Sequence, residues 1–360
     1  MASSCEVAVL YVHADKQSAN NYEIDIAEEK GVRVVRVYYR EAQIPFVNGF
    51  LKIYRFYKAH MLGFKALGSF HPDLLHVHVL TREGIMAWIN KIRTGTPYVI
   101  TEHWSRYLPA NNTYKGGFRR MMTQRIVKSA SAMIAVSETL KKSMQNLHLE
   151  NKNFLVIPNP VDTTLFTSGE LSRNRNIKRF IHISCFEDRP KNISGLLEAV
   201  KNLTKRRSDF ECLLIGDGPE FNLWKSKAEE LELLDKVVFF TGLKEHADLV
   251  KEIQLADFMV LSSNYETFGT VVTECLSCGI PVVATNVGIV AEVINQTNGI
   301  IVPARDSKAL ENGIDEMLDE CRSYDPDVIR KSILTKFGSE SIRRQLLEIY
   351  QKATNYGQNK

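Results

Sequence analysis

Two series of short apolar segments, alternating with helical patterns, constrain the fold of this chain most strongly. Runs rich in β-branched and aromatic residues, bounded by turn residues, predict a first series of strands at 7–12, 32–38, 74–79, 98–101, 132–137 and 154–157. They predict a second series at 180–184, 211–215, 237–240, 258–262, 281–284 and 300–302. Apolar residues at three- and four-residue spacing predict helices between most of the strands. Such alternation is typical of parallel sheets covered on both faces, so each series predicts one doubly wound α/β domain.

The length of 360 residues agrees with two domains. The polar stretch 167–178 has neither strand nor helix periodicity, and we place the domain boundary there, at about residue 170. This predicts a first domain over 1–170, a second over 171–338, and a terminal helix in 339–360 that can pack back across the first domain. In open parallel sheets ligands bind outside the carboxyl ends of the strands, so two such domains facing each other predict a cleft between them.

Composition excludes several classes of protein. Hydrophobic residues make up 44% and charged residues 24%, which argues against disorder, collagen and coiled coil. The six cysteines follow no disulfide framework and are expected as reduced thiols. The N-terminal residues do not resemble a signal peptide, and no window is apolar enough for a membrane span. We therefore expect a cytoplasmic protein, peripheral on a membrane at most.

Charge is distributed unevenly along the chain. The formal net charge is +4, but residues 1–165 carry 21 Lys or Arg against 13 Asp or Glu, and the remaining residues are acidic on balance. Such asymmetry predicts an anionic partner for the first half, such as a membrane surface, a phospholipid-like substrate or nucleic acid.

The segment from Leu261 to Thr285 is the strongest candidate for chemistry. A strand ends near Ser262, and a helix is expected to open between residues 267 and 270 and to close at Gly279. Free backbone N–H groups at the start of such a helix bind anions. The expected donors are those of Thr267, Phe268, Gly269 and Thr270.

Two glutamates flank this helix start. Glu274 lies eight residues beyond Glu266, where a carboxylate can accept a pair of hydrogen bonds from a diol such as that of a ribose. The alternative is that Glu266 only complements the helix dipole and that Glu274 is a solvated helix position.

This segment, with its two Glu residues separated by seven others and followed by PVVAT, resembles the retaining GT-B glycosyltransferases of glycosyltransferase family 4. The resemblance continues through the second domain in the ordered segments IPNPVD, FIHISCFEDRPKN, LLIGDGPE, VFFTGL and NGIIVP. It implies a GT-B fold of two Rossmann-like domains, with the nucleotide-sugar donor in the second and the acceptor in the first. The implied substrate is a nucleotide-diphosphate sugar, with no further cofactor and no metal.

The resemblance also implies roles for particular residues of the second domain. Lys191 matches the lysine that binds the donor diphosphate, whereas the arginine that usually lies six residues earlier is replaced by Cys185, so Arg189 is the candidate to supply the missing charge. The turn Gly216, Asp217 and Gly218 matches the place where the nucleotide lies against backbone, or is a tight structural turn.

The first domain resembles the family more loosely. His103 matches a histidine that approaches the donor sugar, although it could also hydrogen-bond the end of its strand. The family generally has a glycine-containing loop that opens the first helix, but residues 14–25 contain no glycine, so Asn20 or Asn21 is the candidate to start that helix.

Two further groups of residues have less specific patterns. His76 and His78 point the same way from one strand, which suits an acceptor side, simple packing or, less well, a metal. Residues 51–70 mix aromatic residues with cations, and Lys115, Arg119, Arg120, Arg125 and Lys128 extend the basic character. This pattern suits a membrane interface or an ordinary domain helix, whereas a motif for nucleic acid is lacking.

We therefore expect a retaining glycosyltransferase that moves a sugar from a nucleotide-diphosphate donor to a hydroxyl of a saccharide or a polyprenyl-phosphate-linked acceptor, in surface polysaccharide or glycolipid synthesis. Lys191, Glu266 and His103 are the expected catalytic residues. A nucleotide-sugar 2-epimerase and a non-catalytic nucleotide-sugar-binding protein are the alternatives.

Overall fold

The computed structural model describes residues 4–15, 20–40, 48–169 and 176–358. The chain forms two compact units, each with most of its contacts inside itself. The first unit combines Met1–Val99 with Tyr350–Lys360, and the second is Ile100–Ile349. The boundary that we placed at about residue 170 lies outside the described residues, and the domain limits stay predictions.

The first unit begins with a three-stranded sheet in the order β1-β3-β2. β1 (Ala8–Asp15) pairs parallel with β3 (Val32–Arg40), whereas β2 (Tyr22–Glu29) pairs antiparallel with β3. α1 (Asn48–Ala66) packs on this sheet, where Val35, Val37 and Tyr39 form a buried cluster with Ala59 and Leu67.

The helix that we expected to start at Asn20 or Asn21 is absent from the described part of this region, and that expectation is wrong. Tyr22, Ile24 and Ile26 alternate with acidic residues, which is the pattern of a strand. Lys30 and Gly31 both have positive φ, as a two-residue hairpin turn requires. The short turn therefore returns the chain as an antiparallel strand.

A second sheet in the first half of the chain has the order β4-β5-β6-β7. Its strands are β4 (Leu75–His78), β5 (Tyr98–Glu102), β6 (Ala132–Ala135) and β7 (Phe154–Val156). The strands that we expected in this half are confirmed, and β2 is an additional one. The helices that follow β4, β5 and β6 are α2 (Glu83–Thr94), α3 (Gly117–Ser129) and α4 (Glu138–Asn146).

The second half of the chain forms a six-stranded sheet in the order β10-β9-β8-β11-β12-β13, in which every neighbouring pair is parallel. The strands are β8 (Lys178–Ile183), β9 (Phe210–Ile215), β10 (Val238–Gly242), β11 (Phe258–Leu261), β12 (Val282–Thr285) and β13 (Gly299–Val302). The second predicted series of strands is thus confirmed, and so is the α/β class.

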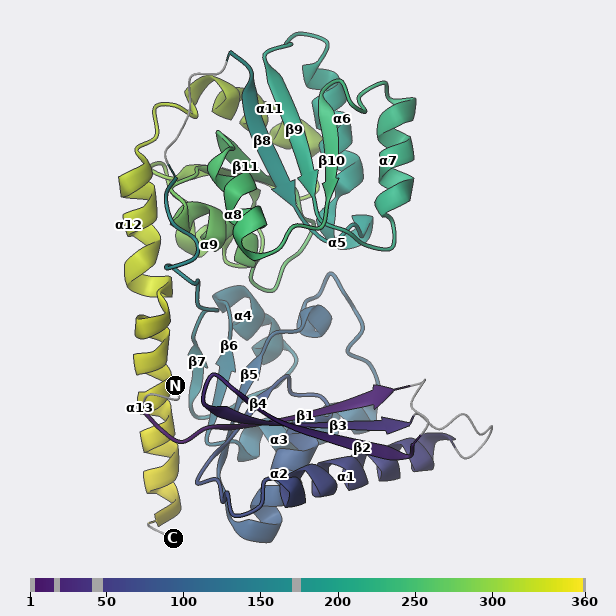
Figure 1. Cartoon of the computed structure of the whole chain (residues 1–360), viewed down its shortest axis with the longest axis vertical. Coiled ribbons are helices and arrows are strands. Elements are labelled where there is room, and N and C mark those ends of the chain that lie inside the picture. Colours follow the sequence, from purple (N-terminus) through teal and green to yellow (C-terminus); the bar gives the residue numbers. More distant parts are fainter. Residues whose placement is uncertain (1–3, 16–19, 41–47, 170–175, 359–360) are drawn as a thin grey trace. The chain divides into compact units, whose positions relative to one another are not determined.

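Helices cover both faces of this sheet (Figure 1). They are α5 (Asp188–Lys191), α6 (Ile193–Leu203), α7 (Phe221–Glu230), α8 (His246–Gln254), α9 (Thr270–Ser277), α10 (Val290–Val293) and α11 (Ser307–Glu320). α6 and α11 pack against one another, and their apolar residues share one buried cluster with β8 and β9. Burial on both faces explains why the strands are continuously apolar.

Two further helices end the chain, α12 (Pro326–Phe337) and α13 (Ser339–Gln358). In the first unit, the Tyr350 hydroxyl lies 2.5 Å from His76 Nδ1, so the end of α13 contacts β4. Among the described residues, every helix is too short or too polar to cross a bilayer.

Candidate functional site

The candidate site lies at the carboxyl end of the six-stranded sheet. β8 lies between β9 and β11 and runs parallel to both. The loops that follow these three strands therefore leave from the same edge of the sheet, as Figure 1 shows for β8 and β9 near α5. These loops contain Lys191, the turn 216–218 and Glu266.

An ion pair joins two of these loops. Lys191 Nζ lies 2.5 Å from Glu266 Oε1, and the two side chains are only 18% and 13% exposed. Ser263 Oγ donates a second hydrogen bond to the same carboxylate oxygen at 2.8 Å. Lys191 is thus not a solvated loop lysine, and Glu266 is not a free charge at the helix start. Removing one partner of such a pair leaves a charge with little water around it.

Backbone contacts fix the loop that carries Lys191. Asn192 has a left-handed conformation between α5 and α6, and its Nδ2 donates to Ser262 O at 3.2 Å. Ser262 Oγ donates to Lys191 O at 2.8 Å, and Asn264 N donates to Pro190 O at 2.7 Å. The loops after β8 and β11 therefore hold one another, and the position of Lys191 follows from both.

The Gly216–Gly218 turn packs closely against the loop after β8. Gly216 has a φ of +136°, and a Cβ there would collide with the backbone carbonyl of Ser184. A Cβ on Gly218 would lie 2.6 Å from Phe186 N. Both glycines are thus required for close approach of two backbone segments, which supports the interpretation as a tight structural turn. A contact of this turn with a nucleotide stays a prediction.

Glu220 is a positioning residue that we did not predict. Its Oε2 accepts hydrogen bonds from Asp188 N at 2.8 Å and from Trp224 Nε1 at 3.0 Å. Both hydrogen bonds lower the pKa of Glu220, and the one from Asp188 has the larger effect. The carboxylate thus accepts from the N–H at the start of α5 and links the loop after β9 to the loop after β8. Glu220 directly follows the segment GDGP (216–219), and this position in the sequence could have indicated it.

The anion site that we expected has backbone N–H groups without intramolecular acceptors. α9 begins at Thr270, after Gly269, whose φ is +94°. Within the described chain, no acceptor lies in hydrogen-bond range of the N–H groups of residues 267–270. α9 ends before Gly279, whose φ is +75°, as we expected. An anion bound here would complete these donors.

Two neighbours hold the loop between Glu266 and Gly269. Ser137, the N-cap of α4, donates from Oγ to Thr267 O at 2.6 Å. Ile289 N donates to Phe268 O at 2.9 Å, and a Cβ on Gly288 would collide with that same carbonyl. Because both carbonyls are engaged, the N–H groups of the loop keep a fixed direction. Ser137 lies 130 residues away in sequence, and no sequence pattern signalled its contact.

Glu274 lies on α9 and is partly buried, not fully solvated. Burial raises the pKa of this carboxyl to about 7. Within the described part of the chain, no donor lies within hydrogen-bond distance of its oxygens. A partly buried carboxylate without a donor suits a ligand that brings its own hydroxyl groups.

His103 and Arg189 lie in the same unit as Lys191 and Glu266. The buried Glu102 accepts from His103 N at 2.9 Å and Trp104 N at 2.8 Å, which fixes the turn that carries His103. Arg189 is exposed and its Nη2 donates to Asn111 O at 3.1 Å. A role for either residue toward a donor stays a prediction.

His76 and His78 belong to the first unit. Their rings stack with centroids 4.4 Å apart, and His76 contacts Tyr350 as described above. In the described ranges, no group of three or more His, Cys, Asp or Glu side chains is arranged to hold a metal ion. Asp325 and Asp327 have the Asp-x-Asp spacing that can hold a divalent ion, but they lie at the start of α12, where Asp325 is the N-cap.

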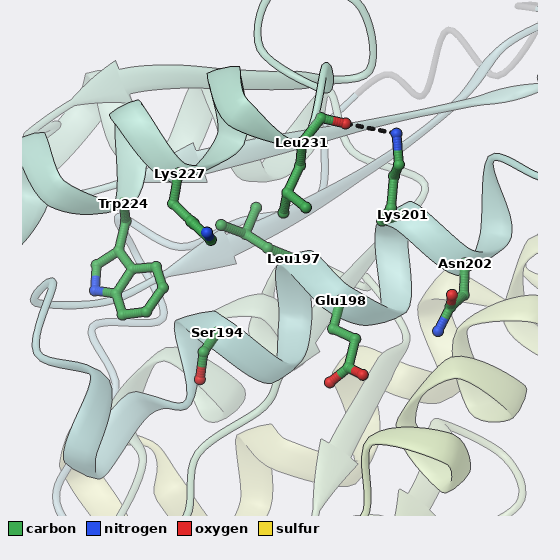
Figure 2. A pocket seen from close by; sticks show the side chains of 8 residues that line it. All are labelled: Ser194, Leu197, Glu198, Lys201, Asn202, Trp224, Lys227 and Leu231. Carbon is green, nitrogen blue, oxygen red and sulfur yellow. Dashed lines mark hydrogen bonds between the residues drawn. The ribbon is translucent and has the colours of Figure 1, made fainter.

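A separate apolar groove of about 200 Å³ lies between α6 and α7. Figure 2 shows its lining side chains, which are Ser194, Leu197, Glu198, Lys201, Asn202, Trp224, Lys227 and Leu231. None of these is a predicted site residue. Lys201 Nζ donates to Leu231 O at 2.6 Å across one end of the groove.

Comparisons with known proteins agree with this arrangement. A family model described as Glyco_transf_4, "Glycosyltransferase Family 4", matches residues 2–165, and "Glycosyl transferases group 1" matches residues 164–326. N-acetyl-alpha-D-glucosaminyl L-malate synthase of Bacillus anthracis is 26% identical over 77% of this chain and 74% of its own.

Two solved structures share the fold. Sucrose-phosphate synthase from Thermosynechococcus elongatus has a TM-score of 0.79 at 22% identity, over 98% of this chain and 90% of that chain. Anabaena HepE in complex with UDP has a TM-score of 0.71 at 19% identity, over 88% and 86% of the two chains. The fold is therefore GT-B.

The raised pKa of Glu274 predicts a pH-dependent effect of E274Q on stability. The native carboxyl stays protonated up to about pH 7, whereas the unfolded one ionises near pH 4.5, so ionisation lowers stability as pH rises between these values. Gln lacks this cost. E274Q should therefore raise the free energy of unfolding relative to wild type by up to about 3 kcal/mol at pH 8, and by much less at pH 5, in urea denaturation.

The matched control is E198Q, which removes the charge of an exposed glutamate on α6. An equal effect of E274Q at both pH values would show that burial does not raise the pKa of Glu274.

Proposed function

This chain belongs to the Family 4 glycosyltransferases, and from that premise we propose that it transfers a sugar from a nucleotide-diphosphate donor to a hydroxyl acceptor with retention of anomeric configuration. The observation that carries the proposal is the pairing of two unsatisfied groups on one short helix. Its first turn offers N–H donors to an anion, and Glu274 further along offers a carboxylate to a diol. A nucleoside diphosphate contains both partners.

The diphosphate is the leaving group, and its negative charge grows as the bond between the sugar and the β-phosphate breaks. The electron pair of that bond goes to a phosphate oxygen. The N–H groups of residues 267–270 and the ammonium of Lys191 stabilise this charge, since fixed donors lose little energy by reorganising during the reaction. Glu266 keeps the Lys191 side chain in place until the donor arrives.

Glu266 and His103 act on the transferred sugar. With Lys191 on the diphosphate, the Glu266 carboxylate accepts hydrogen bonds from sugar hydroxyls, while Ser263 still donates to it. His103, on the turn that Glu102 fixes, holds the sugar near the reacting carbon. Arg189 and the Gly216–Gly218 turn complete the donor site. The acceptor is a saccharide or a polyprenyl-phosphate-linked hydroxyl, which agrees with the basic first half of the chain.

Two other activities are compatible with the same nucleotide site. A nucleotide-sugar 2-epimerase also breaks the bond at the anomeric carbon, and a binding protein would bind the donor without reaction. Incubation with radiolabelled nucleotide sugars and a lipid extract separates the three, because it yields transfer to lipid, formation of the epimer, or binding alone. Transfer supports our proposal, and either of the other results overturns it.

E274A should weaken the binding of nucleoside diphosphates about 10- to 150-fold, which corresponds to the roughly 1.5–3 kcal/mol of hydrogen bonds to a charged group. Isothermal titration calorimetry with UDP and with GDP at pH 8 measures the effect. E198A is the matched control and should bind like wild type. Unchanged affinity in E274A would remove Glu274 from the ribose role.

A chelator should leave transfer activity essentially intact. In the proposed site the positive charge on the diphosphate comes from Lys191 and from the start of α9, so a divalent ion is not required. The assay compares initial transfer rates with and without EDTA, followed by addition of Mg²⁺ or Mn²⁺. Loss of activity with EDTA and its return with either ion would contradict this mechanism.

A further inference from the structure

Helix α3 lies in the longest stretch of the first half that lacks acidic residues. Residues 103–137 contain no Asp or Glu but six Lys or Arg. α3 occupies the middle of this stretch and begins after Gly116 without a side-chain cap and without an acidic residue in its first turn. Its surroundings in sequence are therefore uniformly cationic or neutral.

One face of α3 is buried and the opposite face is exposed. Thr123, Ile126 and Val127 form the buried face. Phe118, Met121, Arg125 and Lys128 lie at three- and four-residue spacing, so they form one stripe along the other side, which we call the α3 stripe. Phe118 is 75% exposed and Met121 is 49% exposed, which is unusual for large apolar side chains that lie next to one another.

The contacts beneath this stripe hold the helix in place. The buried Tyr114 hydroxyl hydrogen-bonds Thr123 Oγ1, and the Tyr107 and Tyr114 rings lie 5.1 Å apart. Asn151 Nδ2 donates to Val127 O at 2.6 Å. These contacts fix the buried side of α3, so Phe118 and Met121 are exposed in the folded protein.

The cations in α3 and just before it lack acidic partners among the described residues. Across the residues that the structure describes, no acidic side chain forms an ion pair with Lys115, Arg119, Arg125 or Lys128. Arg119 and Arg120 lie in the first turn, where the helix dipole disfavours positive charge. Arg120 contacts the Tyr114 ring, with its guanidinium carbon 6.0 Å from the ring centroid. Lys115, Arg119, Arg125 and Lys128 are thus available to an external anion.

Two cations of α1 are engaged within the first unit. Arg55 Nη1 donates to Arg40 O at 2.7 Å, and Lys58 Nζ lies 5.2 Å from the centroid of the Tyr22 ring. Arg55 and Lys58 of the aromatic and basic stretch 51–70 are therefore engaged within the first unit. The same kind of sequence pattern has different consequences in α1 and α3.

We propose that the α3 stripe docks the protein on an anionic lipid bilayer, with Phe118 and Met121 inserted between the headgroups and with the surrounding cations on lipid phosphates. Charge complementarity selects an anionic partner, and the paired apolar side chains select one with an apolar interior. RNA offers phosphates as well, but it gives Met121 no apolar environment. Docking does not depend on the proposed activity. If both proposals hold, docking brings the protein close to lipid-linked acceptors.

Co-sedimentation of the full chain with vesicles tests the charge contribution. Vesicles of phosphatidylglycerol and phosphatidylcholine should bind the protein, pure phosphatidylcholine should not, and rising salt should weaken binding. R119Q/R125Q/K128Q should lower the binding constant roughly 100-fold, about five-fold for each cation. The matched control K225Q/K236Q/K251Q removes the same charge from exposed lysines in the helices and loops around the six-stranded sheet, and it should change the binding constant little.

Fluorescence tests insertion. F118W should be quenched by lipids brominated in the acyl chains, whereas L223W, on an exposed position of α7, should not. Absence of quenching in F118W would overturn the proposal. It would also be overturned by an equal loss of binding in the two triple variants, by a larger loss in K52Q/R55Q/K58Q, or by binding of single-stranded RNA in preference to vesicles.

Discussion

The parallel order β9-β8-β11 is the constraint on which the candidate site depends. It brings the loops after three strands to one edge of the sheet, and the ion pair between Lys191 and Glu266 then joins two of them. Side-chain contacts to backbone, from Asn192, Ser262 and Ser137, hold these loops. In the described chain, the N–H groups of residues 267–270 still lack an acceptor. A rigid sheet edge thereby presents donors in fixed directions, as stabilisation of a developing charge requires.

The charged groups of the site differ in whether the protein itself supplies a partner. Lys191 and Glu266 satisfy one another, so neither demands a ligand for its own stability. Among the described residues Glu274 has no such partner, and burial raises its pKa to about 7. Ionised Glu274 therefore lowers the stability of the protein. Hydrogen bonds from a bound diol would stabilise its charged form. Carboxyl groups with strongly raised pKa values, such as that of Glu274, are typical of ligand-binding sites.

The sequence predicted the regular part of this structure well, because continuous apolar strands and amphipathic helices follow from local pattern. It failed at β2, where the alternation of Tyr22, Ile24 and Ile26 with acidic residues indicated a strand but the family resemblance suggested the start of a helix. The candidate residues were found through motif spacing, whereas their partners were not. Lys191 and Glu266 are 75 residues apart, and a contact over that distance leaves no mark in a single sequence.

A crystal structure of the chain with a bound nucleoside diphosphate tests the central claim most directly. Our account predicts that the ribose hydroxyls donate to the Glu274 carboxylate, that the phosphates accept from the N–H groups of residues 267–270, and that Lys191 Nζ contacts a phosphate oxygen. A nucleotide bound elsewhere, with Glu274 still lacking a donor, would contradict the account.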